Sequence, residues 1–402
     1  MRESPLLQVR DLAVSFTRKG GGKKYAVDGI SFTVFPRQTL AVVGESGCGK
    51  SVTAMSILQL VPDPPGRTER GEILFRERDL LQLDRRQMRS VRGNEIAMIF
   101  QEPMSSLNPV YTIGEQISET VRLHQKVSRR RARDITIQAL RDVGIKEPEI
   151  KIRQYPHQFS GGMRQRVMIA MALACEPAVL LADEPTTALD VTVQAQILNL
   201  LRDIKKTRGM GIILISHDLG IVAQQADVVC VVYAGHVVEY ATVYELFRNP
   251  LHPYTRGLLA SIPKMDRKRK RLKTIDELLA DPEERLQIPG NNNNLIPWWP
   301  RHLTNPTTPT TPTSSPAIPT SPKGPAYPAT PTKNPTPKNT SGIPTAPNTE
   351  GSGSGPKMIL AEVEPLHWVG LAPGKEADKY STGVPIINFR RKENRNGKPA
   401  DE

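Results

Sequence analysis

The segment that most constrains the fold of this chain is GESGCGKS at residues 44–51. It fits the phosphate-binding pattern G-x-x-x-x-G-K-[ST], which requires a strand before it and a helix after it. Both are expected, because the apolar run TLAVVG at 39–44 is typical of a strand buried on both faces of a sheet, and a helix is predicted from about Lys50 to Leu60. The order of strand, glycine-rich loop and helix therefore predicts an α/β fold with a phosphate site at the loop.

The residue types of this loop suit a polyphosphate ligand. Glycines let the backbone turn so that its N–H groups and the helix N-terminus face phosphate oxygens. Lys50 is expected to reach the β- and γ-phosphates of a nucleotide, and Ser51 to ligate Mg²⁺. The alternative is a glycine-rich turn with a chance lysine. The loop residues predicted to contact nucleotide are Gly44, Glu45, Ser46, Gly47, Cys48, Gly49, Lys50 and Ser51.

A second apolar run, AVLLADEP at 178–185, places carboxylates at the expected end of a strand. Ligands of open α/β sheets collect at the carboxyl ends of the strands, so Asp183 is predicted to be a metal ligand. Glu184 follows it and is expected to point elsewhere, where a carboxylate can polarise an attacking water as a general base. The alternative is an acidic pair that caps a helix before Pro185.

The segment FSGGMRQR at 159–166 also has the residue types of an anion site. Ser160, Gly161 and Gly162 precede the apolar helix VMIAMALAC, so free N–H groups and the positive end of a helix are expected to face outward. The loop at 44–51 already serves one set of phosphates. This second site is therefore predicted to hold the γ-phosphate of a nucleotide bound by another subunit.

These motifs, in this order, resemble those of the ATP-binding subunits of ABC transporters. FSGGMRQR resembles the family signature, usually written LSGGQ, from which Phe159 and Met163 depart. The resemblance implies an α/β P-loop NTPase of ABC type, with a RecA-like core, an antiparallel β subdomain and a helical subdomain. It also implies ATP and Mg²⁺ as cofactors, ATP hydrolysis as the activity, and two subunits that dock head to tail around two ATP molecules.

The resemblance assigns further site residues. Gln101 in MIFQEP is similar to the family glutamine that touches Mg²⁺ and senses the membrane subunit, and His217 in ISHD to the histidine that contacts the γ-phosphate. Asp190 in TALD resembles the aspartate that crosses the dimer interface. Phe16 stands where the family places an aromatic residue that stacks on adenine, with Tyr25 as the second candidate. The expected catalytic residues are then Glu184, His217 and Gln101, and the expected metal ligands Ser51, Gln101 and Asp183.

Two segments narrow the resemblance to one branch of the family. FQEPMSSLNPVYTIGEQI at 100–117 and NPLHPYTRGLLASIP at 249–263 are similar to segments of dipeptide and oligopeptide importer ATPases. The first is expected to line the groove in which a permease docks. The implied partners are two transmembrane permeases, a second ABC ATPase that is identical or related, and indirectly an extracytoplasmic peptide-binding protein. The implied location is peripheral, at the cytoplasmic face of the bacterial inner membrane. Nickel and other small-solute importers share these segments and stay open as alternatives.

The net charge of +13 raises another class of function. A soluble ABC ATPase in repair or translation would use such a charge on nucleic acid. Those proteins usually carry paired nucleotide domains, long coiled coils or zinc modules, and none is visible, so no nucleic-acid partner is expected. The three cysteines lack the spacing of a zinc site, and no apolar run reaches the roughly 20 residues that cross a bilayer. A catalytically idle subunit is the third hypothesis, against which Glu184, His217 and the intact loop argue.

The chain is predicted to have three parts. Residues 1–248 are expected to form the nucleotide-binding domain, with a helical subdomain at about 104–158, and residues 249–290 an extension of the peptide-importer type. Residues 291–402 open on NNNN and a Pro/Thr/Ser tract that buries too little apolar surface to offset ordering entropy, which predicts a low-complexity, mostly disordered tail. This tail lacks the cysteine-rich segment with which some members of the branch bind an iron–sulfur cluster. We interpret it as the product of a shifted reading frame or a fusion, with a natural extension as the alternative.

Overall fold

The computed structural model describes residues 3–18, 20–101, 106–187, 189–261, 288, 295, 297–299, 358–371 and 381–389 of the chain. The chain divides into two compact units, one made of residues 1–298 with 356–402 and the other of residues 299–355. Apart from Trp299, every described residue belongs to the first unit.

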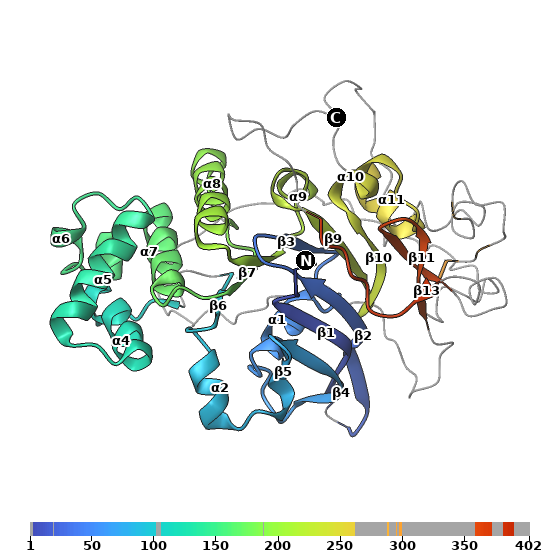
Figure 1. Ribbon diagram of the computed structural model, residues 1–402, viewed down its shortest axis with the longest axis horizontal. Coiled ribbons are helices and arrows are strands. Elements are labelled where there is room, and N and C mark those ends of the chain that lie inside the picture. Colours follow the sequence, from blue (N-terminus) through green and yellow to red (C-terminus); the bar gives the residue numbers. More distant parts are fainter. Residues whose placement is uncertain are drawn as a thin grey trace, which may run out of the picture. The chain divides into compact units, whose positions relative to one another are not determined.

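A nine-stranded sheet forms the centre of the first unit, with the strand order β13-β11-β12-β10-β9-β3-β8-β7-β6 (Figure 1). Five neighbouring strands are parallel, namely β6 (Ile96–Ile99), β7 (Val179–Asp183), β8 (Gly211–Ile215), β3 (Thr39–Val43) and β9 (Val228–Tyr233). Every residue of β3, β7 and β8 is buried, as the apolar runs at 39–44 and 178–184 predict for strands covered on both faces. The α/β core is therefore confirmed.

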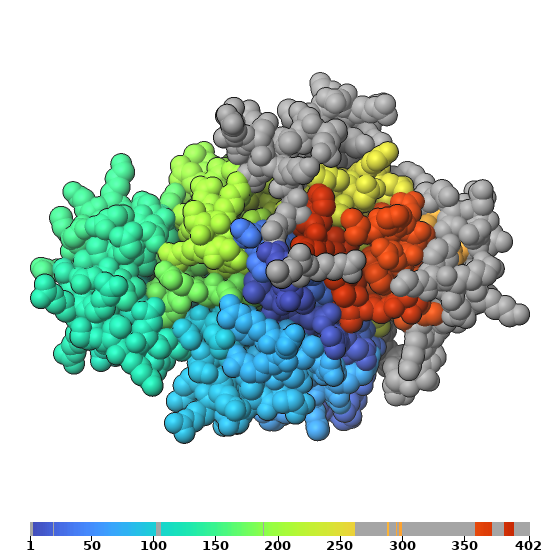
Figure 2. All heavy atoms as spheres, viewed as in Figure 1, coloured from blue at the N-terminus to red at the C-terminus, as the bar shows by residue number. Residues whose placement is uncertain are grey.

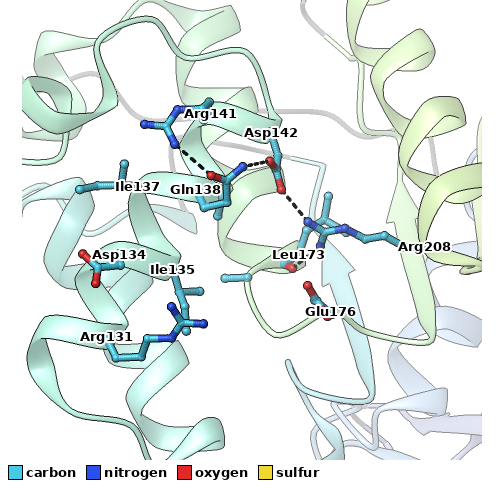
Figure 3. Close-up of a pocket in the computed structure, with 12 residues that line it drawn as sticks. Arg131, Asp134, Ile135, Ile137, Gln138, Arg141, Asp142, Leu173, Glu176 and Arg208 are labelled. Carbon is cyan, nitrogen blue, oxygen red and sulfur yellow. Dashed lines mark hydrogen bonds and ion pairs between the residues drawn. The ribbon is translucent and has the colours of Figure 1, made fainter.

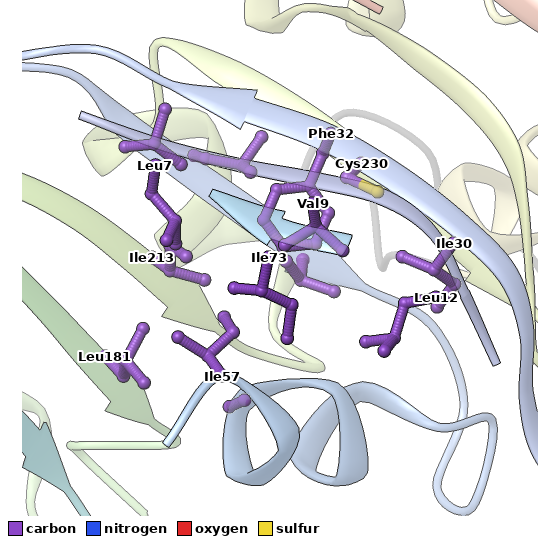
Figure 4. Close-up of a cluster of buried hydrophobic side chains, with 14 of the residues drawn as sticks. Leu7, Val9, Leu12, Ile30, Phe32, Ile57, Ile73, Leu181, Ile213 and Cys230 are labelled. Atoms are coloured by element: carbon purple, nitrogen blue, oxygen red, sulfur yellow. The ribbon is translucent and has the colours of Figure 1, made fainter. Parts of the chain in front are cut away.

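An antiparallel sheet with the order β2-β1-β4-β5 packs against this core. The strands expected at 6–16 and 25–35 are β1 (Leu7–Thr17) and β2 (Lys23–Val34), and β4 (Gly66–Phe75) and β5 (Arg78–Asp79) complete the sheet. Figure 4 shows Leu7, Phe32 and Ile73 of this sheet in one cluster with Ile57 of α1 (Lys50–Ile57) and with Leu181 and Ile213 of the parallel strands. This shared core positions the loop between β3 and α1.

Helices occupy the predicted insertion: α4 (Ile113–Gln125), α5 (Arg129–Asp142) and α6 (Pro148–Lys151), followed by α7 (Gly161–Leu173). Their starts follow from local sequence, because Thr112 and Glu115 form a capping box at α4 and Ser128 caps α5. The first residues of the predicted insertion, 104 and 105, lie outside the described residues. Elsewhere in the described part of the chain the helices are α2 (Arg85–Val91), α8 (Val191–Arg208), α9 (Leu219–Gln225), α10 (Val243–Arg248) and α11 (Pro253–Ala260), with short 3₁₀ turns at Leu80–Gln82 and Pro156–Gln158.

A hollow between α5, the end of α7 and the end of α8 is lined by charged and apolar residues (Figure 3). Arg208 crosses it, donating to Asp142 Oδ2 at 2.7 Å and to the carbonyl oxygen of Leu173 at 2.9 Å. None of the described site residues lines this hollow. Its ion pair joins the helical insertion to α8, so we regard the hollow as structural.

The C-terminal part of the chain departs from the sequence prediction. Within the predicted tail at 291–402, the structure has β11 (Ile359–Glu364), β12 (His367–Leu371) and β13 (Ser381–Thr382). β12 pairs antiparallel with β10 (His236–Thr242), and Figure 2 shows residues 358–371 (orange-red) against the region of α10 and α11 (yellow). The prediction was of a low-complexity, mostly disordered tail; within it, β11 and β12 form a strand pair that the composition did not indicate. Their apolar residues are sufficient for a strand pair that covers the edge of β10. The Pro/Thr/Ser tract itself lies outside the described residues.

We expect Val369→Asp to lower the free energy of unfolding by about 3 kcal/mol or more, because it buries an unpaired carboxylate. Val369 of β12 is fully buried in a cluster with Leu251, Ala361 and Leu371. Leu366→Asp, in the exposed turn between β11 and β12, is the matched control and should change stability by no more than about 0.5 kcal/mol. Urea unfolding measures both. Equal effects of the two variants would show that β12 does not pack in the folded unit.

Candidate functional site

Two glycines of the loop at 44–51 are required by its geometry. Gly44 and Gly49 have φ angles of 151° and 108°, a region that favours glycine. A Cβ on Gly44 would lie 2.2 Å from the carbonyl oxygen of Val232, and one on Gly49 would lie 2.3 Å from that of Ala26. The loop therefore passes so close to the backbones of β9 and β2 that only glycine fits at these two positions.

The side chain of the loop lysine folds back and donates hydrogen bonds to carbonyl oxygens of the same loop. Lys50 is buried, and its Nζ donates to the carbonyl oxygens of Gly44 at 2.9 Å and Glu45 at 2.7 Å. Glu45, Ser46 and Gly47 are exposed, whereas Cys48 is buried, and burial raises the pKa of its thiol. The ammonium group thus lies on the inner side of a loop whose tip is open to solvent.

Ser51 of the loop and Asp183 of β7, both predicted to ligate Mg²⁺, lie side by side. Ser51 Oγ donates a hydrogen bond of 3.1 Å to Asp183 Oδ1. Burial raises the pKa of the Asp183 carboxyl and Glu184 adds to the rise, while the Ser51 hydrogen bond and Lys50 oppose it. A buried carboxylate with a raised pKa is short of compensating positive charge.

The three predicted catalytic residues lie together, because Gln101 and His217 both contact the carboxylate of Glu184. Gln101 Nε2 donates to Glu184 Oε2 at 3.0 Å, and His217 Nδ1 lies 3.0 Å from Glu184 Oε1. The Thr187 hydroxyl also donates to Oε2, at 3.0 Å. Thr187 was not singled out by the sequence, although it opens the TALD segment. The side chain of Glu184 is 16% exposed and that of His217 is 63% exposed, so the cluster opens to solvent on the His217 side.

The backbone at Glu184 departs from the extended geometry of the strand that ends at Asp183. Glu184 has a φ angle of 46°, which is unusual for a residue other than glycine. Its N–H donates to the carbonyl oxygen of Ile215 at 3.0 Å, which anchors this turn to the end of β8. Strained backbone of this kind persists where surrounding contacts impose it and is enriched at functional sites.

The residues of the second anion site lie at the N-terminus of α7. Ser160 caps this helix, accepting from the N–H of Met163 at 3.4 Å. A Cβ on Gly162 would lie 2.8 Å from Val193 Cγ1 of α8, whereas a Cβ on Gly161 would meet no described atom within 4 Å beyond its chain neighbours and the backbone of its own helix. Ser160 and Gly161 are exposed. Among the described contacts, no hydrogen bond joins these three residues to the loop at 44–51.

Asp190 and Phe16 have local roles in the structure. Asp190 is the N-cap of α8 and accepts from the N–H of Val193 at 3.0 Å. Phe16 is half-buried near the end of β1, opposite Lys24 and Gly66, and Tyr25 is half-buried on β2. Their assignment to a partner interface and to adenine stays a prediction.

Tyr254 is a loop contact that the sequence did not single out. The N–H of Glu45 donates to Tyr254 Oη at 2.9 Å, and the tyrosine is fully buried in α11 with its ring 4.3 Å from that of Tyr233. Burial raises the pKa of its hydroxyl. Tyr254 lies in the segment NPLHPYTRGLLASIP, whose resemblance indicated a branch of the family but did not indicate a contact of this tyrosine with the loop. The extension after residue 248 therefore reaches the phosphate-binding loop.

Two protein families match the sequence. The family described as "ABC transporter" matches residues 27–187, and the family described as "Oligopeptide/dipeptide transporter, C-terminal region" matches residues 238–290. The oligopeptide transport ATP-binding protein OppD of Bacillus subtilis (strain 168) is 50% identical over 306 residues, 76% of this chain and 80% of that protein. The dipeptide transport ATP-binding protein DppD of the same strain is 52% identical over 271 residues, 67% of this chain and 81% of that protein.

Solved structures of ABC cassettes have the same fold. CbiO1 from Clostridium perfringens, part of the ABC transporter complex cbiONQ, is similar with a TM-score of 0.53 and 27% identity, over 61% of this chain and 92% of that chain. The dimeric bacterial ABC transporter cassette MJ0796 is similar with a TM-score of 0.53 and 23% identity, over 59% of this chain and 98% of that chain.

We expect Gly49→Ala to lower the melting temperature far more than Gly47→Ala. Both glycines have positive φ angles, but only the Cβ at Gly49 meets a backbone carbonyl, and nothing lies within 4 Å of the Cβ position of Gly47. Gly47→Ala should cost about 1–2 kcal/mol through its backbone angle alone, and Gly49→Ala about 3 kcal/mol or more. Thermal unfolding of the two variants measures the difference. Similar losses would contradict the close contact of the loop with β2.

Proposed function

Because the chain belongs to the ATP-binding subunits of ABC transporters, in the oligopeptide and dipeptide branch, we propose that it hydrolyses ATP with Mg²⁺ to power peptide import through separate permeases. The observation that carries this proposal is the Glu184 carboxylate, held by Gln101, Thr187 and His217 directly after the metal-site candidate Asp183. Nucleotide binding is a property of the family. The metal, the partners and the peptide substrate are part of the proposal.

The donor set at the end of β7 fits Mg²⁺. This ion prefers hard oxygen ligands, and Ser51 and Asp183 supply a hydroxyl and a carboxylate within hydrogen-bond distance of each other. The raised pKa of buried Asp183 is consistent with a site completed by a cation. When bound with ATP, Mg²⁺ neutralises charge on the β- and γ-phosphates. We assign Ser51, Asp183 and Gln101 to hold it.

Hydrolysis then needs a base that is positioned in advance. Glu184 accepts a proton from the attacking water, while Gln101, Thr187 and His217 restrict the directions in which its carboxylate points. Lys50 supplies positive charge from the inner side of the loop. In this proposal Lys50 contacts the phosphates, three side chains orient the Glu184 carboxylate, and Glu184 takes the proton of the water.

The second anion site implies a second ATPase subunit. Ser160 and Gly161 are exposed at the start of α7, with helix N–H groups directed outward. We propose that they contact the γ-phosphate of ATP bound to the partner's loop, in a homodimer or a heterodimer. The exposed carboxylate of Asp190, which caps α8, is assigned to the same interface.

A groove near Gln101 is proposed to receive the permease. It is lined by apolar and small side chains, including Met98, Phe100, Met168 and Met171, and Phe100 is exposed. Among the described helices, none is both long and apolar enough to span a bilayer. We therefore propose peripheral attachment at the cytoplasmic face of the membrane, through the permeases and with an extracytoplasmic peptide-binding protein acting on their other side.

We expect the complete transporter, isolated through a tag on this chain and reconstituted in vesicles, to hydrolyse ATP and take up labelled di- and oligopeptides. Glu184→Gln should still bind ATP but should lose hydrolysis by about 10²-fold or more, together with uptake. Glu77→Gln makes the same change in an exposed turn and should behave like the wild type. Unchanged turnover in Glu184→Gln would disprove the assigned base, and ATP hydrolysis without peptide uptake would disprove the substrate.

We expect Tyr254→Phe to weaken ATP binding about fivefold, because removal of the hydroxyl leaves the Glu45 N–H without its partner, a loss of about 1 kcal/mol. Since the ring remains but the hydrogen bond is also present without nucleotide, the melting temperature should fall by only a few degrees. A fluorescence titration of the isolated chain with ATP gives the affinity, with Tyr155→Phe on the exposed surface as the control. Wild-type affinity in Tyr254→Phe would show that α11 does not support the loop.

A further inference from the structure

A second group of polar side chains lies at the other end of the sheet from Glu184. Glu245 of α10, Glu364 of β11 and His367 of β12 each offer one ligand atom, and these atoms lie within 4.8 Å of one another. The two glutamates are half-buried and the histidine is fully buried. The group joins elements that are more than a hundred residues apart in the sequence.

The ring of His367 is fixed through one nitrogen only. Its Nε2 lies 2.6 Å from Oε1 of Glu239, and both residues are fully buried. The other nitrogen, Nδ1, is buried without a hydrogen-bond partner and lies 3.8 Å from Glu364 Oε2. Buried polar atoms normally have partners, so an orphaned imidazole nitrogen needs an explanation.

Glu239 determines which nitrogen carries the proton. Its carboxylate also accepts from the N–H groups of Leu251 at 2.8 Å and His252 at 2.9 Å, so it acts as an acceptor toward every neighbour. The Nε2–H of His367 therefore donates to it, and in the neutral ring Nδ1 keeps its lone pair. A histidine whose second nitrogen is held by a carboxylate is the usual arrangement of a metal ligand.

The charges around Nδ1 also favour a cation. Among the described residues, neither Glu245 nor Glu364 forms an ion pair with a lysine or an arginine, and the one cationic partner of Glu364 is His367 if it is protonated. Asn249 Nδ2 donates to both oxygens of Glu364, at 3.3 and 3.4 Å, which orients that carboxylate. Two carboxylates and one neutral imidazole balance a divalent ion in charge.

From this geometry we propose that Glu245, Glu364 and His367 bind a divalent transition-metal ion, of which Zn²⁺ is the best match, with water completing its coordination. One imidazole nitrogen and two carboxylate oxygens are typical Zn²⁺ ligands. Ligands at about 2.1 Å from one ion are at most about 4.2 Å apart, so any pair of these atoms beyond that distance must move closer, which rotation of the two glutamate side chains would allow. The ion fastens β11 and β12 to α10 and so holds the C-terminal segment on the unit that carries the nucleotide site.

The test uses the full chain, stripped of metal with a chelator that is then removed, and titrated with Zn²⁺ alone in the absence of nucleotide. Calorimetry is expected to give one site of micromolar or tighter affinity, and thermal unfolding a higher melting temperature with Zn²⁺. Glu245→Gln and Glu364→Gln should each weaken binding at least tenfold and remove the thermal shift. Glu362→Gln, on the same strand outside the group, should keep both.

A further variant separates this site from the nucleotide site. Asp183→Asn should leave the Zn²⁺ response intact, so the result does not depend on the proposed ATPase. The proposal is overturned if no stoichiometric Zn²⁺ binding is found or if the two glutamate variants bind Zn²⁺ like the wild type. It is equally overturned if those variants lower the melting temperature by the same amount with and without Zn²⁺, which would identify a salt bridge to protonated His367.

Discussion

The site depends on one residue with a left-handed backbone conformation directly after β7. Asp183 is the last residue of the strand, and its carboxylate lies against Ser51 at the start of α1. In an extended strand the next side chain would point to the opposite face of the sheet. The φ angle of 46° at Glu184 instead keeps its carboxylate at the same edge, within reach of Gln101 and His217. The two adjacent acids therefore contact different sets of side chains. The proposed roles, metal ligand for Asp183 and base for Glu184, depend on that difference.

The extension after residue 248 is connected to the phosphate-binding loop by hydrogen bonds. The Tyr254 hydroxyl accepts from Glu45 in the loop, and the Tyr254 N–H donates to His252 Nδ1 at 3.1 Å. The His252 N–H in turn donates to Glu239, which also binds His367 of β12. A continuous set of hydrogen bonds, buried except for the part-buried bond to Glu45, therefore runs from the C-terminal strands to the phosphate-binding loop. Because buried polar groups are costly when one partner is lost, this set ties the two regions together.

Local sequence predicted those parts of the site that depend on a short motif. The loop at 44–51 and the acidic pair at 183–184 were predicted from strand, turn and helix signals alone, because their geometry is set within a few residues. Gln101 and His217 came from the family resemblance, and their convergence on Glu184 depends on the order of strands in the sheet. Tyr254 was beyond such reasoning, since its contact with Glu45 spans 209 positions of sequence. The strands β11 and β12 were missed because the composition of the whole tail, dominated by proline and threonine, hid a short apolar segment inside it.

The two glycines at the start of α7 show how far the single chain explains its own sequence. Capping by Ser160 is ordinary, because α4, α5, α8 and α10 are capped in the same way. Gly162 has an internal reason, since a Cβ there would meet Val193 of α8. Gly161 has no such reason among the described residues: its φ angle is not positive, and a Cβ there would meet no described atom within 4 Å beyond its neighbours and its own helix backbone. Open space at this helix end is compatible with the proposed approach of the terminal phosphate of a partner-bound nucleotide.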